Sequence, residues 1–142
     1  MHLYRHRVLY GDTDQMGVVY YANYLRFFEG ARNEWCRDHG VTYRDIEAAG
    51  LMLPVIDATL RYLRPARYDD VLEISTRAAA TRVKLRFAYQ VRRAGDSTIL
   101  VTGHTVHASV SKEGRPTRFP AWLEEKLRPH VGAFDNFDNE ES

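Results

Sequence analysis

The sequence has very little cysteine and no long apolar run, and these two absences exclude several classes of protein. Its single thiol, Cys36, cannot form an internal disulfide or a cysteine-based zinc cluster, which is typical of a reducing compartment. No apolar run approaches the ~18 residues of a membrane span, and the N-terminal residues are not followed by the apolar segment of a signal peptide. We therefore expect a cytoplasmic protein without a membrane span.

The sequence also lacks an excess of positive or of negative charge. The 20 Lys and Arg residues nearly balance the 19 Asp and Glu residues, for a net charge of +1, whereas a dedicated nucleic-acid binder carries a basic surplus. There is no Gly-x-Ser-x-Gly nucleophile elbow, no P-loop and no Gly-x-Gly-x-x-Gly dinucleotide fingerprint. His104 and His107 lie three apart on a predicted strand, so they face opposite sides and cannot bind one metal ion. We expect no nucleic-acid partner, metal or cofactor.

What is present predicts one ordinary globular domain. Hydrophobic residues make up 44% of the 142 residues and charged residues 27%, which is close to the average of soluble domains. No repeat or low-complexity linker divides the chain, so residues 1–133 are predicted to form a single domain. Residues 134–142 are acidic and without apolar periodicity, which predicts a flexible tail.

Apolar periodicity predicts a strand, one long helix and then a series of strands. The helix covers residues 22–39 and ends before Gly40, and Cys36 on its apolar stripe is predicted to be a buried structural thiol. Strands are predicted at residues 4–10, 51–62, 71–79, 82–92 and 98–110, with a bulge at Gly103, and a short helix begins at Pro120. This order predicts an α+β fold in which a curved antiparallel sheet wraps around the long helix.

The segment between the first strand and the long helix carries two aspartates, Asp12 and Asp14, in a glycine-bounded loop. A helix N-terminus presents N–H groups without intrahelical acceptors, which can stabilise an oxyanion. A carboxylate nearby is ionised at neutral pH and can act as a nucleophile or as a general base toward water. The alternative is an Asx-turn or helix-capping role for both aspartates, and for Asp12 this structural interpretation is favoured.

The sequence of this segment resembles the signature of a known family. It reads Asp12-Thr13-Asp14-x-x-Gly17-Val18-Val19-Tyr20-Tyr21-Ala22-Asn23-Tyr24-Leu25, with Phe28-Glu29 and Ala31-Arg32 following. It is similar to the 4-hydroxybenzoyl-CoA thioesterase family of hotdog-fold enzymes, and most to the short acyl-CoA thioesterases associated with the Tol-Pal envelope system. The resemblance extends over about residues 4–125 and implies a hotdog fold, a curved antiparallel five-stranded β-sheet wrapped around a long central α-helix.

The resemblance implies a function and a set of site residues. It implies hydrolysis of a short-chain or aromatic acyl-CoA to the free acid and CoA, so coenzyme A enters as part of the substrate. The catalytic carboxylate falls on Asp14 and the backbone N–H oxyanion donor on Tyr21. Substrate-binding residues fall on Gly17, Val18, Val19, Tyr20 and Tyr24. The resemblance also implies a homodimer or homotetramer with the active site at the subunit interface. Alternatives are an acyl-carrier-protein thioesterase and a non-catalytic acyl-CoA-binding module.

Three further features of the sequence bear on substrate binding and on the helix. The cationic side of the strand at residues 82–92, with Arg82, Lys84 and Arg86, is predicted to contact the CoA phosphates, and a plain solvent-facing surface is the alternative. Glu29 is predicted to be structural and paired with Arg32. The acyl pocket is expected beside the helix start, with Val55 and Ile56 contributing alongside Tyr20 and Tyr24.

Overall fold

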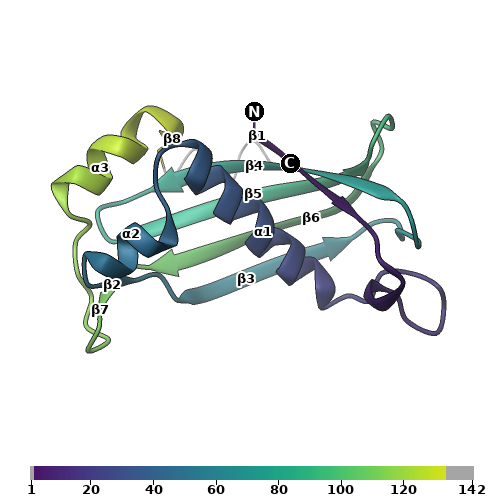
Figure 1. The fold of residues 1–142 in the computed structure, drawn as a ribbon, viewed down its shortest axis with the longest axis horizontal. Helices are drawn as coiled ribbons and strands as arrows, with labels where there is room; N and C mark the ends of the chain where they lie inside the picture. Colours follow the sequence, from purple (N-terminus) through teal and green to yellow (C-terminus); the bar gives the residue numbers. More distant parts are fainter. Residues whose placement is uncertain (1, 134–142) are drawn as a thin grey trace.

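A computed structural model describes residues 2–133, so the tail expected at 134–142 lies outside the described residues. Its elements in chain order are β1 (His2–Arg7), the 3-10 turn η1 (Tyr10–Asp12), α1 (Asn23–Asp38), α2 (Tyr43–Ala48), β2 (Leu51–Met52), β3 (Val55–Tyr62), β4 (Val71–Ala80), β5 (Lys84–Arg93), β6 (Ile99–Ala108), β7 (Val110–Ser111), α3 (Ala121–Leu127), the 3-10 turn η2 (Arg128–His130) and β8 (Val131–Gly132). Figure 1 shows α1 lying across one face of the sheet.

The main sheet has six strands, so the expectation of five is wrong by one short strand. Five strands follow the order β1-β4-β5-β6-β3 with antiparallel neighbours, and β8 pairs with β4 in parallel. The reason is the length of β4: β1 pairs with it only as far as Thr76, which leaves the last part of that edge open. Val131 and Gly132 pair there with Ala78 and Ala79.

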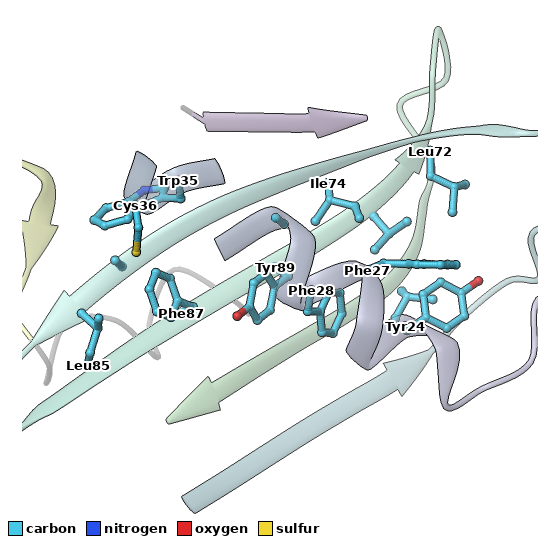
Figure 2. Close-up of a cluster of buried hydrophobic side chains, with 14 of the residues drawn as sticks. Tyr24, Phe27, Phe28, Trp35, Cys36, Leu72, Ile74, Leu85, Phe87 and Tyr89 are labelled. Atoms are coloured by element: carbon cyan, nitrogen blue, oxygen red, sulfur yellow. The ribbon is translucent and has the colours of Figure 1, made fainter. Parts of the chain in front are cut away.

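The apolar stripe of α1 and the inner face of the sheet form the core, as the periodicity predicted. Figure 2 shows the ring of Phe28 lying against Tyr89, and the two centroids are 4.2 Å apart with the rings nearly parallel. Trp35 meets Phe87 edge-on at 5.5 Å. Cys36 is buried, and burial raises the pKa of its thiol to about 12, which confirms that the one cysteine is a core residue.

Gly103 does not form the predicted bulge. It pairs in register with both Leu60 and Tyr89, and the register shifts instead leave out Ile56 of β3 and Leu100 of β6. A Cβ atom on Gly103 would lie 2.7 Å from the Phe28 ring and 2.9 Å from the Thr59 carbonyl oxygen. The glycine therefore lets α1 approach the sheet closely, which sequence periodicity alone does not distinguish from a bulge.

Several element boundaries differ from the prediction for local reasons. The strand predicted at residues 51–62 is divided at Pro54, which has no N–H for a ladder, into β2 and β3. The first strand ends at Arg7 because the chain turns at η1. Helix α2 was missed because six residues are too few to show a period, although Thr42 and Asp45 form a capping box before it.

No helix within residues 2–133 is long and apolar enough to cross a membrane. Over the same residues, no group of three or more His, Cys, Asp and Glu side chains is placed to hold a metal ion.

Candidate active site

The loop that carries both aspartates folds back on itself and joins the start of α1. The Asp14 N–H donates to the Val18 carbonyl at 2.9 Å, and the Tyr20 N–H donates to the Asp12 carbonyl at 3.0 Å. At the tip, Gly17 has a φ of +78° and donates to the Asp14 carbonyl at 3.0 Å. The hairpin therefore places Asp14 beside the segment that leads into α1.

Asp12 holds this loop in place through hydrogen bonds of its side chain and its carbonyl oxygen. Its side chain is buried, and the carboxylate accepts hydrogen bonds of 2.8 Å from His6 Nε2, from the Leu9 N–H and from Arg26 Nη2. Its carbonyl oxygen also accepts from Asn23 Nδ2 at 2.8 Å, which ties the loop to the first residue of α1. Burial alone would raise the pKa of Asp12, but these donors together hold the pKa below its usual value. These contacts are what the structural interpretation of Asp12 requires.

Asp14 is only partly exposed, and its carboxylate is only partly engaged. One oxygen, Oδ1, accepts the Met16 N–H at 2.9 Å in an Asx turn. The other oxygen accepts no hydrogen bond from residues 2–133. The Asx-turn and catalytic interpretations of Asp14 are therefore compatible, because the turn orients the side chain and leaves one oxygen available.

The first turn of α1 presents backbone donors beside this carboxylate. Asn23 N–H donates back to the Tyr20 carbonyl at 3.0 Å, whereas the N–H groups of Tyr21 and Ala22 donate to no acceptor among residues 2–133. The Tyr21 carbonyl accepts from the Tyr62 hydroxyl at 3.1 Å, which orients the peptide that carries the Ala22 N–H. Because helix N-termini carry partial positive charge, the two N–H groups suit a developing oxyanion.

A hollow of about 190 Å³ opens next to Tyr21. Its walls bring together three of the predicted substrate-binding residues, Val18, Val19 and Tyr24, with Tyr62 and Arg64 on the opposite side. Gly17 and Tyr20 belong to the adjoining loop and are exposed. Arg64 is not among the predicted site residues, although it lies within residues 4–125, over which the family resemblance extends.

A second, larger hollow of about 540 Å³ runs along α1 from the same helix start. One wall is the side of α1 from Ala22 to Arg32, and the other consists of Val55 and Ala58 on β3 with Thr105 on β6. Val55, expected at an acyl pocket, therefore lies here, whereas its neighbour Ile56 is exposed on β3 and is not part of this wall. The helix start thus lies between two hollows.

The predicted cationic residues do not lie beside this site within one chain. Arg82 and Lys84 are exposed at the beginning of β5, and the Asp14 loop lies at the other end of the sheet, beyond a ten-residue strand of about 30 Å (Figure 1). Arg86 is 8% exposed, so the alternative of a plain solvent-facing surface does not hold for Arg86. The alternation was correct, because Leu85, Phe87 and Tyr89 belong to the core cluster and Arg86 does not. Its contact with a phosphate stays a prediction.

Arg32 does not pair with Glu29, contrary to the expectation from their spacing. No ion pair within 4.0 Å joins them in the part of the chain that the structure describes, and Glu29 is exposed. Burial alone would lower the pKa of Arg32, but the electrostatic influence of the nearby Tyr89 and Tyr43 hydroxyls raises its pKa above the usual value. Its Nε is buried and has no partner among the described residues.

A chain of buried hydrogen bonds continues from Tyr89 beneath the larger hollow. The Tyr89 hydroxyl lies 2.9 Å from Thr105 Oγ1, which lies 2.9 Å from His107 Nε2, and His107 Nδ1 lies 3.0 Å from the Leu53 carbonyl oxygen. Burial, with a smaller contribution from the Arg32 charge, lowers the pKa of His107 to about 4. A neutral His107 must donate from Nδ1 to the carbonyl, so Nε2 accepts from Thr105, and Thr105 accepts from Tyr89.

The low pKa of His107 makes the fold sensitive to acid. The folded protein keeps His107 neutral down to about pH 4, whereas the unfolded chain takes up a proton near the ordinary value of 6.5. The free energy of unfolding is therefore expected to fall by about 3 kcal/mol between these values, with full stability above pH 6.5. Urea unfolding measured across this range checks it, and His107→Gln should reduce the decline. An equal decline in this variant would contradict the assignment.

Comparison with known proteins agrees with this geometry. The model of the thioesterase-like superfamily matches residues 8–127. The acyl-CoA thioesterase YbgC of Haemophilus influenzae is 33% identical over 118 residues, which cover 80% of this chain and 85% of that protein. A 1,4-dihydroxy-2-naphthoyl-CoA hydrolase of Thermosynechococcus vestitus is 31% identical over 84% of this chain and 86% of its own length. The structure of a hypothetical protein from Thermus thermophilus superposes with a TM-score of 0.85 at 34% identity, covering 92% of this chain and 99% of that one.

Proposed function

The chain belongs to the thioesterase-like superfamily, whose relatives include acyl-CoA thioester hydrolases, and from this membership we propose that it hydrolyses a short-chain or aromatic acyl-CoA to the free acid and CoA. The observation that carries the proposal is one arrangement: among residues 2–133, one Asp14 carboxylate oxygen accepts no hydrogen bond, and its loop is hydrogen-bonded to a helix start with two N–H groups that have no acceptor there. A carboxylate and an oxyanion site are the two groups that thioester hydrolysis needs.

Two routes use the same residues. As a general base, Asp14 takes a proton from water while the water oxygen bonds to the thioester carbon. The C–S bond then breaks, and the departing CoA thiolate takes up a proton. As a nucleophile, Asp14 itself bonds to this carbon, CoA leaves as the thiolate, and water hydrolyses the resulting anhydride. In both routes the Tyr21 N–H donates to the oxyanion.

The two hollows suggest how the substrate lies. A thioester at the Tyr21 N–H has one hollow on each side, which allows the acyl group to follow α1 and the pantetheine arm to pass toward Arg64. Arg64 is then the cation nearest to the CoA side, and Gly17, Val18, Val19, Tyr20 and Tyr24 surround the thioester. Coenzyme A is part of the substrate, and no separate cofactor is needed for either route.

We also propose a homodimer, or a homotetramer of two such dimers, with paired β3 edges. Within the part of the chain that the structure describes, β3 pairs only with β6, and all of its eight residues except Leu60 are exposed, which leaves an open edge. Two β3 strands pairing antiparallel across a twofold axis would continue the sheet into a second copy. That copy's β5 begins at the end of the sheet where this chain's Asp14 loop lies, so Arg82 and Lys84 would approach the site from the second subunit.

A charge at this edge tests the dimer. Ile56→Asp is expected to give a monomer of 16.5 kDa by light scattering, because Ile56 is 53% exposed on β3 and a buried carboxylate would oppose pairing. Leu3→Asp is the matched control, since Leu3 is 54% exposed on β1 at the other edge. Dissociation by Leu3→Asp, or an intact oligomer with Ile56→Asp, would contradict the proposal.

The function is tested with a panel of short, long, aryl and hydroxyaryl acyl-CoAs, each also supplied on acyl carrier protein. We expect release of free thiol from at least one acyl-CoA at a higher kcat/KM than from the same acyl group on the carrier protein. Binding of every acyl-CoA without thiol release would instead support a non-catalytic module. Membership of the branch associated with the Tol-Pal system and a cytoplasmic location both stay predictions.

A further inference from the structure

We infer that Tyr62 is a positioning residue of the active site, because its hydroxyl group orients the Ala22 N–H as a second oxyanion donor beside the Tyr21 N–H. This inference rests on the proposed thioesterase function and concerns the same site. Both N–H groups lie at the exposed start of α1 and have no acceptor among residues 2–133. Each belongs to a peptide whose carbonyl oxygen is held by a different part of the chain.

The peptide that carries the first donor is held by the loop and the helix start themselves. It joins Tyr20 to Tyr21, and its carbonyl oxygen accepts the Asn23 N–H at 3.0 Å. Asn23 is in turn fixed, because its side chain donates to the Asp12 carbonyl at 2.8 Å. The orientation of the Tyr21 N–H is therefore set by contacts within one continuous stretch of the chain.

The peptide that carries the second donor is held from the sheet. It joins Tyr21 to Ala22, and its carbonyl oxygen accepts the hydroxyl of Tyr62, the last residue of β3, at 3.1 Å. The Tyr24 N–H also donates to this oxygen, at a longer 3.4 Å. A hydrogen bond to the carbonyl of a peptide polarises it, which strengthens its N–H as a donor. Tyr62 thus acts through the peptide, and no ligand atom has to reach its side chain.

Aromatic neighbours hold the Tyr62 side chain in place for this contact. Its ring centroid lies 4.9 Å from that of Tyr21 and 5.8 Å from that of the buried Tyr24. Burial, with a smaller contribution from Tyr21, raises the pKa of Tyr62, so its hydroxyl keeps its proton and donates at neutral pH. The ring also lines the smaller hollow. Removing the hydroxyl alone therefore keeps the ring contacts and the wall of this hollow.

Tyr62→Phe tests this role in the whole protein. We expect kcat for acyl-CoA hydrolysis to fall by about 10-fold while KM stays within about twofold of wild type, because the donor acts on the oxyanion. The loss is smaller than the ~10²–10³ typical of a deleted donor, since the Ala22 N–H remains but is less well oriented. Tyr68→Phe is the matched control. Tyr68 is 57% exposed, against 43% for Tyr62, and lines neither hollow, so its kcat should stay within about twofold.

The carbonyl stretching frequency of a bound thioester separates this role from a merely structural one. Hydrogen bonds to a carbonyl oxygen lower this frequency, so an acyl-CoA bound to Asp14→Asn is compared with the same acyl-CoA bound to a variant that also carries Tyr62→Phe. We expect a higher frequency in the double variant. An unchanged frequency, an unchanged kcat in Tyr62→Phe, or an equal loss of kcat in Tyr68→Phe would overturn the inference. An absence of thiol release from every acyl-CoA by the wild type would overturn the proposed function itself.

Discussion

Replacing Asp14 with Asn is expected to lower kcat for acyl-CoA hydrolysis by about 10³-fold while the protein stays folded. Asparagine keeps the side-chain oxygen that accepts the Met16 N–H at 2.9 Å, so the loop is preserved. It removes the negative charge that attacks the thioester or takes a proton from water. The effect should appear in kcat rather than in KM, because the hollows that bind the substrate are unchanged. Steady-state thiol release measures it.

Asp96→Asn is the matched control for this substitution. Asp96 accepts the N–H of Thr98, two residues further on, at 2.9 Å, which is the contact that Asp14 makes with Met16. It lies in the turn between β5 and β6 and lines neither hollow beside the helix start. Its replacement should leave kcat within about twofold of wild type. A comparable loss of kcat in both variants would mean that Asp14 acts only through the turn.

Asp12→Ala is expected to lower the free energy of unfolding by about 3 kcal/mol. The side chain is buried and its carboxylate accepts three hydrogen bonds of 2.8 Å, and their loss leaves the Leu9 N–H without its acceptor. The lost contact with Arg26 contributes little to this decrease, because Arg26 is largely exposed and its guanidinium can be hydrated instead. Urea unfolding near neutral pH measures the difference.

The control for Asp12 is Glu34→Ala, which removes a solvent-exposed ion pair of 3.4 Å with Arg37 on α1 and should cost less than about 1 kcal/mol. The pH dependence gives a second check. Because the pKa of Asp12 is held below its ordinary value in the folded state, its stabilisation is present above that ordinary value. It is lost as pH falls through the lowered folded pKa, so wild type and Asp12→Ala should converge in acid. A constant difference would contradict the buried-carboxylate assignment.

The fold could be predicted well because each layer has its own period. The alternation in β5 and the helical spacing of Phe28 and Trp35 place the same side chains in the core that the structure places there. The strand β8 and the helix α2 could not be predicted, because two and six residues are too short for a period to appear. Gly103 shows a further limit, because a glycine within a predicted strand is compatible both with a bulge and with a close approach of a helix.

The candidate site was predicted where its residues are consecutive and missed where the fold brings distant residues together. Asp14 and the Tyr21 N–H lie in one loop, so a motif identifies both. Arg64 and Arg32 line the two hollows from just after a strand and from the middle of a helix. Both lie in stretches that resemble the family, but nothing in these stretches indicates which hollow each residue lines. The same limit explains why Arg82 and Lys84 were expected beside the site. Alternation in a strand predicts which face of the sheet a side chain lies on, but not at which end of the sheet the strand begins.

The most direct measurement mixes Asp14→Asn with an equimolar amount of an acyl-CoA that the wild type hydrolyses, and follows both binding and the integrity of the thioester. We expect the variant to bind the acyl-CoA with an affinity close to the KM of the wild type. We also expect the thioester to remain intact, by mass, for about 10³ times as long as one wild-type turnover takes. Hydrolysis by the variant at the wild-type rate would contradict the assignment of the catalytic carboxylate to Asp14.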